Sequence, residues 1–247
     1  MIRLLDTHCH LDAYPDPRDV LADAEAASVD VIAVSETPDT YRRLRTRLGR
    51  TPGVTVALGL HPASAAAAAP GQLERFLRML PDAAWIGEVG LDFRPGIDRR
   101  EKARQTAAFQ SVLDHQIVAT KPMSVHSRGA SKEVVDCLKQ ASARAALHWY
   151  SGTLATVDDA LAAGIWFSVN PSMIRTPKGQ ALISRLPQDR VLCETDGPYC
   201  RAASRPALPS DVRSVALYLS HEWQVPEVDA ARVLAANVRA FTTTEAT

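Results

Sequence analysis

Asp6-Thr7-His8-Cys9-His10 follows the mostly apolar run Ile2–Leu5 at the start of the chain. Alternate residues of a strand point to the same side. We therefore expect His8 and His10 to face one way together and Cys9 to face the other way. Two imidazoles at the end of a first strand provide half of a metal site. An isolated H-x-H is weak evidence, so its meaning depends on the rest of the chain.

Short apolar runs alternate with amphipathic segments throughout the chain, which is typical of buried strands connected by helices. Eight strand-then-helix units favour a parallel sheet covered by helices. Closed on itself, such a sheet is an α/β fold of the (β/α)8 TIM-barrel type. The predicted strands are Ile2–Asp6, Asp30–Ser35, Val54–Leu60, Ala84–Val89, Met123–Val125, Ala145–Leu147, Ile165–Val169 and Val191–Glu194.

The segments between these strands carry helical patterns. The predicted helices are Asp16–Val29, Pro38–Arg50, Gly71–Leu80, Glu101–Thr120, Ser131–Ala141, Val157–Ala163 and Lys178–Leu186, followed by the extra C-terminal helices Asp211–Trp223 and Val228–Phe241. A doubly wound open sheet is the alternative, but no glycine-rich fingerprint follows the first strand. No repeat or boundary divides the chain, so we predict that residues 1–247 form a single domain.

The composition excludes several classes of protein. The 247 residues are 46% hydrophobic and carry a formal net charge of zero, so no global field attracts nucleic acid or an anionic membrane. Binding of a polyanion would then depend on local basic groups or on metal ions. The 4 cysteines have no regular spacing, which argues against a zinc finger or a disulfide framework and favours a reducing cytoplasm. No apolar run is long enough to span a membrane.

Acidic and imidazole side chains recur where the predicted strands end. In a (β/α)8 barrel those ends surround one mouth, where the chemistry takes place. The candidate metal ligands are His8, His10, Glu88, His126, His148 and Asp196. Six ligands are more than one ion needs, so they predict two divalent ions. Paired ions stabilise the attacking and the leaving oxygen of a displacement at phosphorus.

Two carboxylates have predicted catalytic roles. Glu88 can bridge two ions because it has two oxygens, and a buried glutamate is costly unless it is paired or metal-bound. Asp196 can ligate one ion and accept a proton from water, although a residue before Gly-Pro can also simply shape a turn. His126 and His148 can alternatively be hydrogen-bonded core residues. Asp92 is a candidate for orienting a ligand histidine.

Predicted loops on the same face carry candidate substrate contacts. His61, which precedes a proline, is a candidate contact to substrate or phosphate. Arg94, Arg128 and Arg201 lie in loops that follow predicted strands. Basic loops around a metal pair would bind phosphates, although each arginine can also be an ordinary solvated charge.

Six motifs, in chain order, resemble the TatD family of metal-dependent deoxyribonucleases. They are the DTHCHLD of residues 6–12, the GLHP of 59–62, the GEVGLD of 87–92, the HSR of 126–128, His148 with Ser151-Gly152, and the ETDGPY of 194–199. The resemblance spans nearly the whole chain. It implies a TIM-barrel hydrolase of the amidohydrolase superfamily with DNA 3′-exonuclease activity, using magnesium, manganese or zinc.

The resemblance also implies a ligand set. His8, His10, Glu88 and Asp196 would hold one ion, while Glu88, His126 and His148 would hold the other. The chain departs from the common pattern at His148–Gly152, where many members carry Cys-Phe between the histidine and Ser-Gly. With Tyr14–Pro17 and Trp166–Val169, this segment looks like the TatD-type nuclease of bacterial Qat anti-phage modules. The family resemblance implies DNA, in single strands or at 3′ ends, as the substrate, and the finer resemblance implies other proteins of the module as partners.

Two other functions stay open. The first is an amidohydrolase that cuts a C–N bond, or a deacylase that acts on charged tRNA. Members of the wider superfamily often carry a carboxylated lysine on the fourth strand, whereas Glu88 occupies that place here and Lys121 precedes the fifth strand. The second is a non-catalytic subunit of a defence complex. The presence of all six candidate ligands argues against a dead enzyme.

Overall fold

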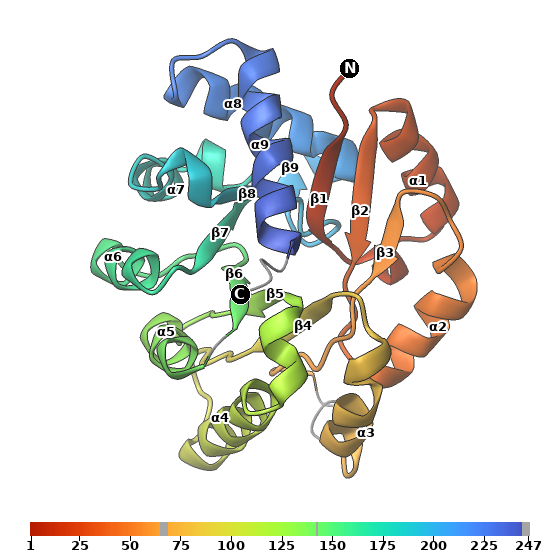
Figure 1. Cartoon of the computed structure of the whole chain (residues 1–247), viewed down its shortest axis with the longest axis vertical. Helices are drawn as coiled ribbons and strands as arrows, with labels where there is room; N and C mark the ends of the chain where they lie inside the picture. The colour runs from red at the N-terminus through yellow and green to blue at the C-terminus, as the bar shows by residue number, and fades with distance from the viewer. Residues whose placement is uncertain (65–68, 142, 244–247) are drawn as a thin grey trace.

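A barrel of eight parallel strands with helices around it forms the centre of the computed structural model, which describes residues 1–64, 69–141 and 143–243 (Figure 1). This confirms the predicted (β/α)8 TIM-barrel fold. The strands are β1 Leu4–Cys9, β2 Val29–Ala33, β3 Val54–Val56, β4 Ile86–Gly90, β5 Pro122–His126, β6 Arg144–Leu147, β7 Trp166–Val169 and β8 Val191–Cys193. The helices are α1 Pro17–Ala26, α2 Pro38–Leu48, α3 Gln72–Met79, α4 Arg99–Leu113, α5 Ser131–Gln140, α6 Leu154–Ala162, α7 Pro177–Ile183, α8 Val212–Glu222 and α9 Glu227–Thr242.

The barrel closes at two seams. Strands β1 to β3 form one ladder and β4 to β8 form another. A parallel bridge between Leu58 and Ile86 joins the first ladder to the second, and a bridge between Cys9 and Gly197 joins the region after β8 to β1. Since the eight barrel strands, β1 to β8, run in parallel, their carboxyl ends meet at one mouth.

Side-chain caps explain why several outer helices begin where they do. Thr37, Asp98, Thr153 and Thr176 each accept a hydrogen bond from a backbone N–H in the first turn of the helix that follows. The first N–H groups of a helix have no partner within it, and these oxygens supply one. The caps therefore fix the points at which the chain leaves the barrel mouth and turns back along its outside.

The C-terminal helix α9 closes the opposite end of the barrel, across which it runs in Figure 1. Its Phe241 packs between Trp85 and Trp166, with ring centroids 5.6 and 5.5 Å away. Asn237 donates to the carbonyl of Val191 at 2.8 Å, which attaches the helix to the start of β8. With this end filled by apolar side chains, the carboxyl end is left for chemistry.

Four segments differ most from the sequence-based expectations. Of the predicted third strand, Val54–Leu60, only Val54–Val56 forms a strand, β3. The first strand runs on to Cys9, because its ladder with β2 continues to that residue. The helix predicted over Glu101–Thr120 ends at Leu113, and a 3-10 helix, Gln116–Thr120, follows it after His115 caps its start. The loop after β8 contains a short antiparallel hairpin of β9, Arg201–Ala202, and β10, Arg205–Pro206.

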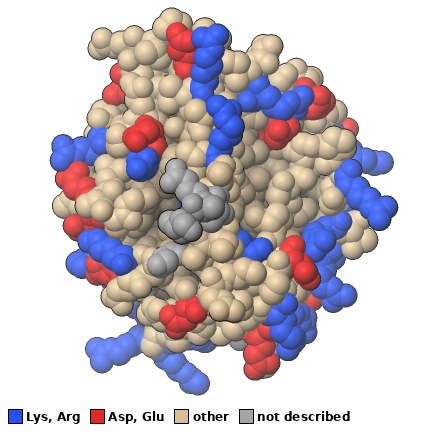
Figure 2. Space-filling view, in the orientation of Figure 1, with Lys and Arg blue, Asp and Glu red and all other residues tan. Residues whose placement is uncertain are grey.

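Surface charge is mixed on the face that carries α9, where basic and acidic side chains are interspersed (Figure 2). This distribution agrees with the formal net charge of zero. None of the helices among the described residues has both the length and the apolar character needed to cross a bilayer.

Candidate metal centre

All six predicted ligand residues converge on the mouth of the barrel. His8 lies in β1 and Glu88 in β4, whereas His126 ends β5. His10, His148 and Asp196 lie one to three residues beyond the ends of β1, β6 and β8. Strand alternation accounts for the placement of His8 and His10 together.

The first group of ligand atoms consists of His8 Nε2, His10 Nε2, Glu88 Oε2 and Asp196 Oδ1. The His8 nitrogen lies 3.6 Å from the Glu88 oxygen and 3.5 Å from the Asp196 oxygen. The corresponding distances from His10 are 3.3 and 3.4 Å, and the two nitrogens are 3.3 Å apart. Donors bonded to one tetrahedral ion at about 2.1 Å lie about 3.4 Å apart. The group therefore fits a single divalent ion.

An unpartnered oxygen supports this fit. Asp196 Oδ1 is buried and lacks a hydrogen-bond partner among the described residues. A buried carboxylate oxygen is costly without a cation or a donor. An ion held between Asp196, His8 and His10 would satisfy it.

The second group surrounds the other oxygen of Glu88. Glu88 Oε1 lies 2.6 Å from His126 Nδ1 and 2.7 Å from His148 Nε2, and these nitrogens are 3.1 Å apart. Glu88 thus directs one oxygen toward each group. This is the arrangement that a carboxylate shared by two ions requires.

His61 also faces Glu88, and its other ring nitrogen has a backbone partner. Its Nε2 lies 3.4 Å from Glu88 Oε1, while its Nδ1 accepts a hydrogen bond from the backbone N–H of Ala63 at 3.1 Å. A neutral imidazole that accepts at one nitrogen carries its proton on the other. This hydrogen bond makes Nε2 of His61 a donor toward Glu88, although His61, Glu88 and His126 also lie close enough together to hold an ion.

Partners behind the histidines set their tautomers. The Asp92 carboxylate lies 3.1 Å from His126 Nε2 and accepts the proton of that nitrogen. The other nitrogen, Nδ1, faces Glu88 and would ligate an ion once it has lost its own proton. His8 Nδ1 contacts Ser124 Oγ at 2.7 Å, which leaves His8 Nε2 directed into the first group. Asp92 thus contacts a candidate ligand histidine as the sequence predicts.

In the metal-free site, protonated imidazoles balance the negative charge of the carboxylates. Burial alone would raise the pKa of Glu88, but the neighbouring histidines hold it well below its usual range. Burial would likewise lower the pKa of His10 and His126, but the carboxylates beside them raise these values to about 10 and about 9. Both imidazoles are therefore protonated at pH 7 when no cation is present.

Metal binding at pH 7 is expected to release protons. His10 and His126 must lose theirs before they can ligate, so we expect about two protons per chain when both ions bind. Calorimetric titration with Mn²⁺ in two buffers of different ionisation enthalpy measures this number. His126→Ala should release about one proton fewer, and a binding heat independent of the buffer would contradict the assignment.

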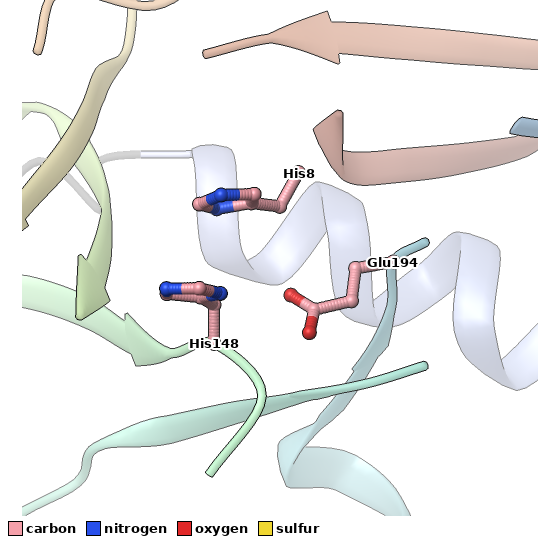
Figure 3. A group of neighbouring side chains, drawn as sticks. All are labelled: His8, His148 and Glu194. Atoms are coloured by element: carbon pink, nitrogen blue, oxygen red, sulfur yellow. The ribbon is translucent and has the colours of Figure 1, made fainter. Parts of the chain in front are cut away.

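Two acidic side chains outside the predicted set support the site. Glu194 is fully buried beside the stacked rings of His8 and His148, whose centroids are 3.9 Å apart (Figure 3). Its carboxylate accepts from the backbone N–H of Trp149 at 2.8 Å and from Asn170 Nδ2 at 3.1 Å. Glu88 is selected from the sequence because an acid in an apolar strand is costly unless it is paired or metal-bound. The same argument could have selected Glu194, which ends the predicted strand Val191–Glu194.

Asp6 connects β1, which carries His8, with the segment after β8 that carries Asp196. Its Oδ1 accepts from the backbone N–H groups of His8 at 3.2 Å and Thr195 at 2.9 Å, and its Oδ2 accepts from the Thr195 hydroxyl. Asp196 in turn donates its N–H to the carbonyl of His8 at 2.8 Å. These bonds hold Asp196 in the left-handed region, at φ 49°, which a non-glycine residue adopts only when its surroundings impose it.

Asp6→Asn is expected to lower the free energy of unfolding by about 1–3 kcal/mol, because an asparagine has one acceptor oxygen and leaves a buried donor unpaired. It should also weaken Mn²⁺ binding, since His8 and Asp196 lose their common support. Urea denaturation and metal titration measure the two effects. Asp82→Asn, at an exposed aspartate, is the control, and equal stability of the two variants would contradict this account.

A cavity of about 740 Å³ opens over these groups at the mouth, and its lining includes His61, Arg94 and Arg128. These three predicted substrate contacts therefore lie beside the site. Arg201 does not line this cavity. It lies in the β9–β10 hairpin, where its guanidinium donates to the carbonyl of Ser204.

Residues 5–243 match the family described as TatD related DNase. The chain belongs to this family. It is 31% identical over 220 residues to the human protein named deoxyribonuclease TATDN3, covering 80% of this chain and 78% of that one. It is 29% identical over 234 residues to YcfH of Escherichia coli K12, described as an uncharacterized metal-dependent hydrolase, with 88% and 87% covered.

Solved structures of the TatD family have the same fold. The crystal structure of YJJV, a TatD homolog from Escherichia coli K12, superposes with a TM-score of 0.88 at 25% identity and covers 99% of both chains. A TatD-family hydrolase from Entamoeba histolytica superposes with a TM-score of 0.83 at 16% identity, covering 98% of this chain and 99% of that one. The chain is thus a TatD-type metal-dependent hydrolase built on a TIM barrel.

Proposed function

We propose that this TatD-family chain is a two-metal phosphodiesterase that removes nucleotides from the 3′ ends of DNA. The observation that carries the proposal is the position of Glu88, which directs Oε2 toward His8 and His10 and Oε1 toward His126 and His148. A pair of sites on one bridging carboxylate suits displacement at phosphorus. The name deoxyribonuclease that the human relative carries supports DNA as the substrate.

The proposed ligands divide between the two sites. His8, His10, Glu88 and Asp196 hold one divalent ion, and Glu88, His126 and His148 hold the other. Magnesium, manganese and zinc are the candidate ions. When bound, such ions neutralise charge on the scissile phosphate and lower the pKa of water.

The side chains then provide binding and proton transfer. The oxygen of water forms a bond to phosphorus, and the bond from phosphorus to the 3′ oxygen of the preceding nucleotide breaks. That 3′ oxygen takes a proton from solvent water and becomes a hydroxyl, and a 5′-mononucleotide leaves. Burial would raise the pKa of Asp196, but His10 and His8 hold it low, so its carboxylate is ionised and can accept the proton of the attacking water. His61 donates from Nε2 to a phosphate oxygen, and Arg94 and Arg128 pair with phosphates of the strand.

The test is degradation of single-stranded DNA labelled at its 5′ end, with Mg²⁺ or Mn²⁺ added. We expect a ladder that shortens from the 3′ end, release of mononucleotides, and no reaction in EDTA. Hydrolysis of an amide substrate or of an aminoacyl-tRNA, with DNA left intact, would replace the proposal by one of those activities. Release of internal fragments only would contradict action at ends.

We further propose that the enzyme acts in anti-phage defence with partner proteins. The finer resemblance of His148–Gly152, Tyr14–Pro17 and Trp166–Val169 to the nuclease of Qat modules supports this role. A strain carrying the module with Glu88→Ala should lose protection in plaque assays, whereas Glu222→Ala, at an exposed acid on α8, should keep it. Full protection by Glu88→Ala would instead favour a non-catalytic subunit.

A further inference from the structure

The barrel mouth has two sides of different chemistry. Arg94 and Arg128 follow β4 and β5, whereas Glu36 and Tyr199 follow β2 and β8, and all four line the cavity. In a barrel of eight strands, the fifth strand lies opposite the first, to which β2 and β8 are the neighbours. A DNA strand that crosses the metal centre would therefore pass from a basic side to an acidic and aromatic side.

Tyr199 is an exposed aromatic beside the proposed metal centre. Its side chain is 56% exposed, and its ring lies 4.9 Å from that of His10, at 71° between planes. Exposed aromatic rings next to a phosphate-binding site stack on nucleic-acid bases, whatever the base. A base stacked on Tyr199 would therefore lie beside the first group of ligand atoms.

Glu36 gives the same side a negative charge. It lines the cavity, and its backbone carbonyl accepts from the N–H of His61 at 2.8 Å. Within residues 1–64, 69–141 and 143–243, no basic side chain forms an ion pair with its carboxylate. Burial raises the pKa of Tyr199, and the charges of Glu36 and Asp12 add to that effect. An uncompensated carboxylate repels a phosphate that comes near it.

The opposite side is suited to phosphates. The N–H of Phe93 donates to the carbonyl of Arg128 at 2.8 Å, which joins the loops after β4 and β5. Arg94 is partly exposed, with Nη1 3.8 Å from Asp92 Oδ1, and Arg128 is exposed. Both guanidinium groups are therefore accessible to the backbone of a bound strand.

We propose that Tyr199 and Glu36 form the subsite for the terminal nucleoside, in which Tyr199 stacks on the base and Glu36 excludes a terminal phosphate. The inference rests on the proposed function and specifies the end it acts on, a 3′ end that carries a hydroxyl. Arg94 and Arg128 hold the remaining strand on the other side of the metal centre. A continuous strand would carry its next phosphate toward Glu36, so the subsite also favours ends over internal bonds.

Three single-stranded oligonucleotides test the subsite with Mn²⁺ present: one with a 3′ hydroxyl, one with a 3′ phosphate, and one whose last nucleotide lacks its base. Tyr199→Ala should lower kcat/KM about tenfold to hundredfold on the first, and leave the rate on the third within about threefold of wild type. Tyr199→Phe should restore most of the loss. Leu217→Ala, at an exposed apolar side chain on α8, is the control.

Glu36→Gln should reduce the preference for a 3′ hydroxyl over a 3′ phosphate about tenfold, whereas Glu222→Gln on α8 should leave it unchanged. The subsite would be overturned, while the nuclease activity stands, if Tyr199→Ala lowered kcat/KM equally on oligonucleotides with and without the terminal base. It would also be overturned if Glu36→Gln kept the wild-type preference for a 3′ hydroxyl over a 3′ phosphate. Failure of the wild type to degrade any of the three strands would overturn the proposed function, and the subsite with it.

Discussion

Glu88→Ala is expected to lower the metal-dependent rate of DNA hydrolysis by about 10³-fold or more. Loss of one preorganised group that stabilises transition-state charge costs about 10²–10³-fold, and Glu88 contacts both groups of ligand atoms through its two oxygens. Both ions should therefore bind weakly in the variant. Initial rates on 5′-labelled single-stranded DNA, measured together with Mn²⁺ binding, give the two effects.

Two control variants accompany Glu88→Ala. Glu88→Gln keeps the volume of the side chain but has a single oxygen acceptor, so it should also lose most of the rate. Glu222→Ala, at an exposed position on α8, should behave as wild type. Circular dichroism establishes that each variant is folded. Release of mononucleotides by folded Glu88→Ala at the wild-type rate would rule out the proposed site.

Asp196→Asn is expected to lower kcat by about 10²–10³-fold while the second ion stays bound, because an amide cannot take up the proton of the attacking water. The ligand set of the second group, Glu88, His126 and His148, is intact in this variant. Metal titration should therefore show the loss of one ion, in contrast to Glu88→Ala, in which both bind weakly. Asp82→Asn is the matched control, and a folded Asp196→Asn variant that binds two ions and hydrolyses DNA normally would refute the assigned role.

The candidate ligands could be predicted from the sequence because they lie at or near the ends of the predicted strands. The order of apolar runs indicates eight strands, and an acid or imidazole directly after such a run lies at the barrel mouth whatever the exact register. This is why His8, Glu88 and Asp196 could be placed together even though β1 runs further than expected. An error of two or three residues in a strand boundary does not move a side chain from one end of a barrel to the other.

Features that depend on long loops or on hydrogen-bond direction could not be predicted in this way. Arg201 follows β8 in the sequence, but the hairpin of β9 and β10 takes its guanidinium to Ser204, and no periodicity signals that turn. The acceptor role of His61 Nδ1 depends on the N–H of Ala63, which only the folded backbone places. Glu194 carried a usable signal, an acid in a buried strand, although its contacts with Trp149 and Asn170 require the tertiary structure.

The helix break near His115 has a local cause that pattern counting overlooks. The segment 101–120 keeps enough apolar residues for one long helix, but His115 caps the start of a new 3-10 helix by accepting from the N–H of Ile117. Residues that bond to their own backbone compete with helix continuation. Such competition is decided by the side chain's conformation, so the sequence alone gives no clear boundary.

The number of Mn²⁺ ions bound per chain tests the central claim most directly. The measurement is equilibrium dialysis at pH 7.5 of the wild type, His126→Ala and Glu88→Ala, with bound metal counted by mass spectrometry. The two-ion site predicts two ions in the wild type, one in His126→Ala and weak binding at both sites in Glu88→Ala. One ion per wild-type chain at saturation, or two retained by Glu88→Ala, would contradict a pair of ions bridged by Glu88.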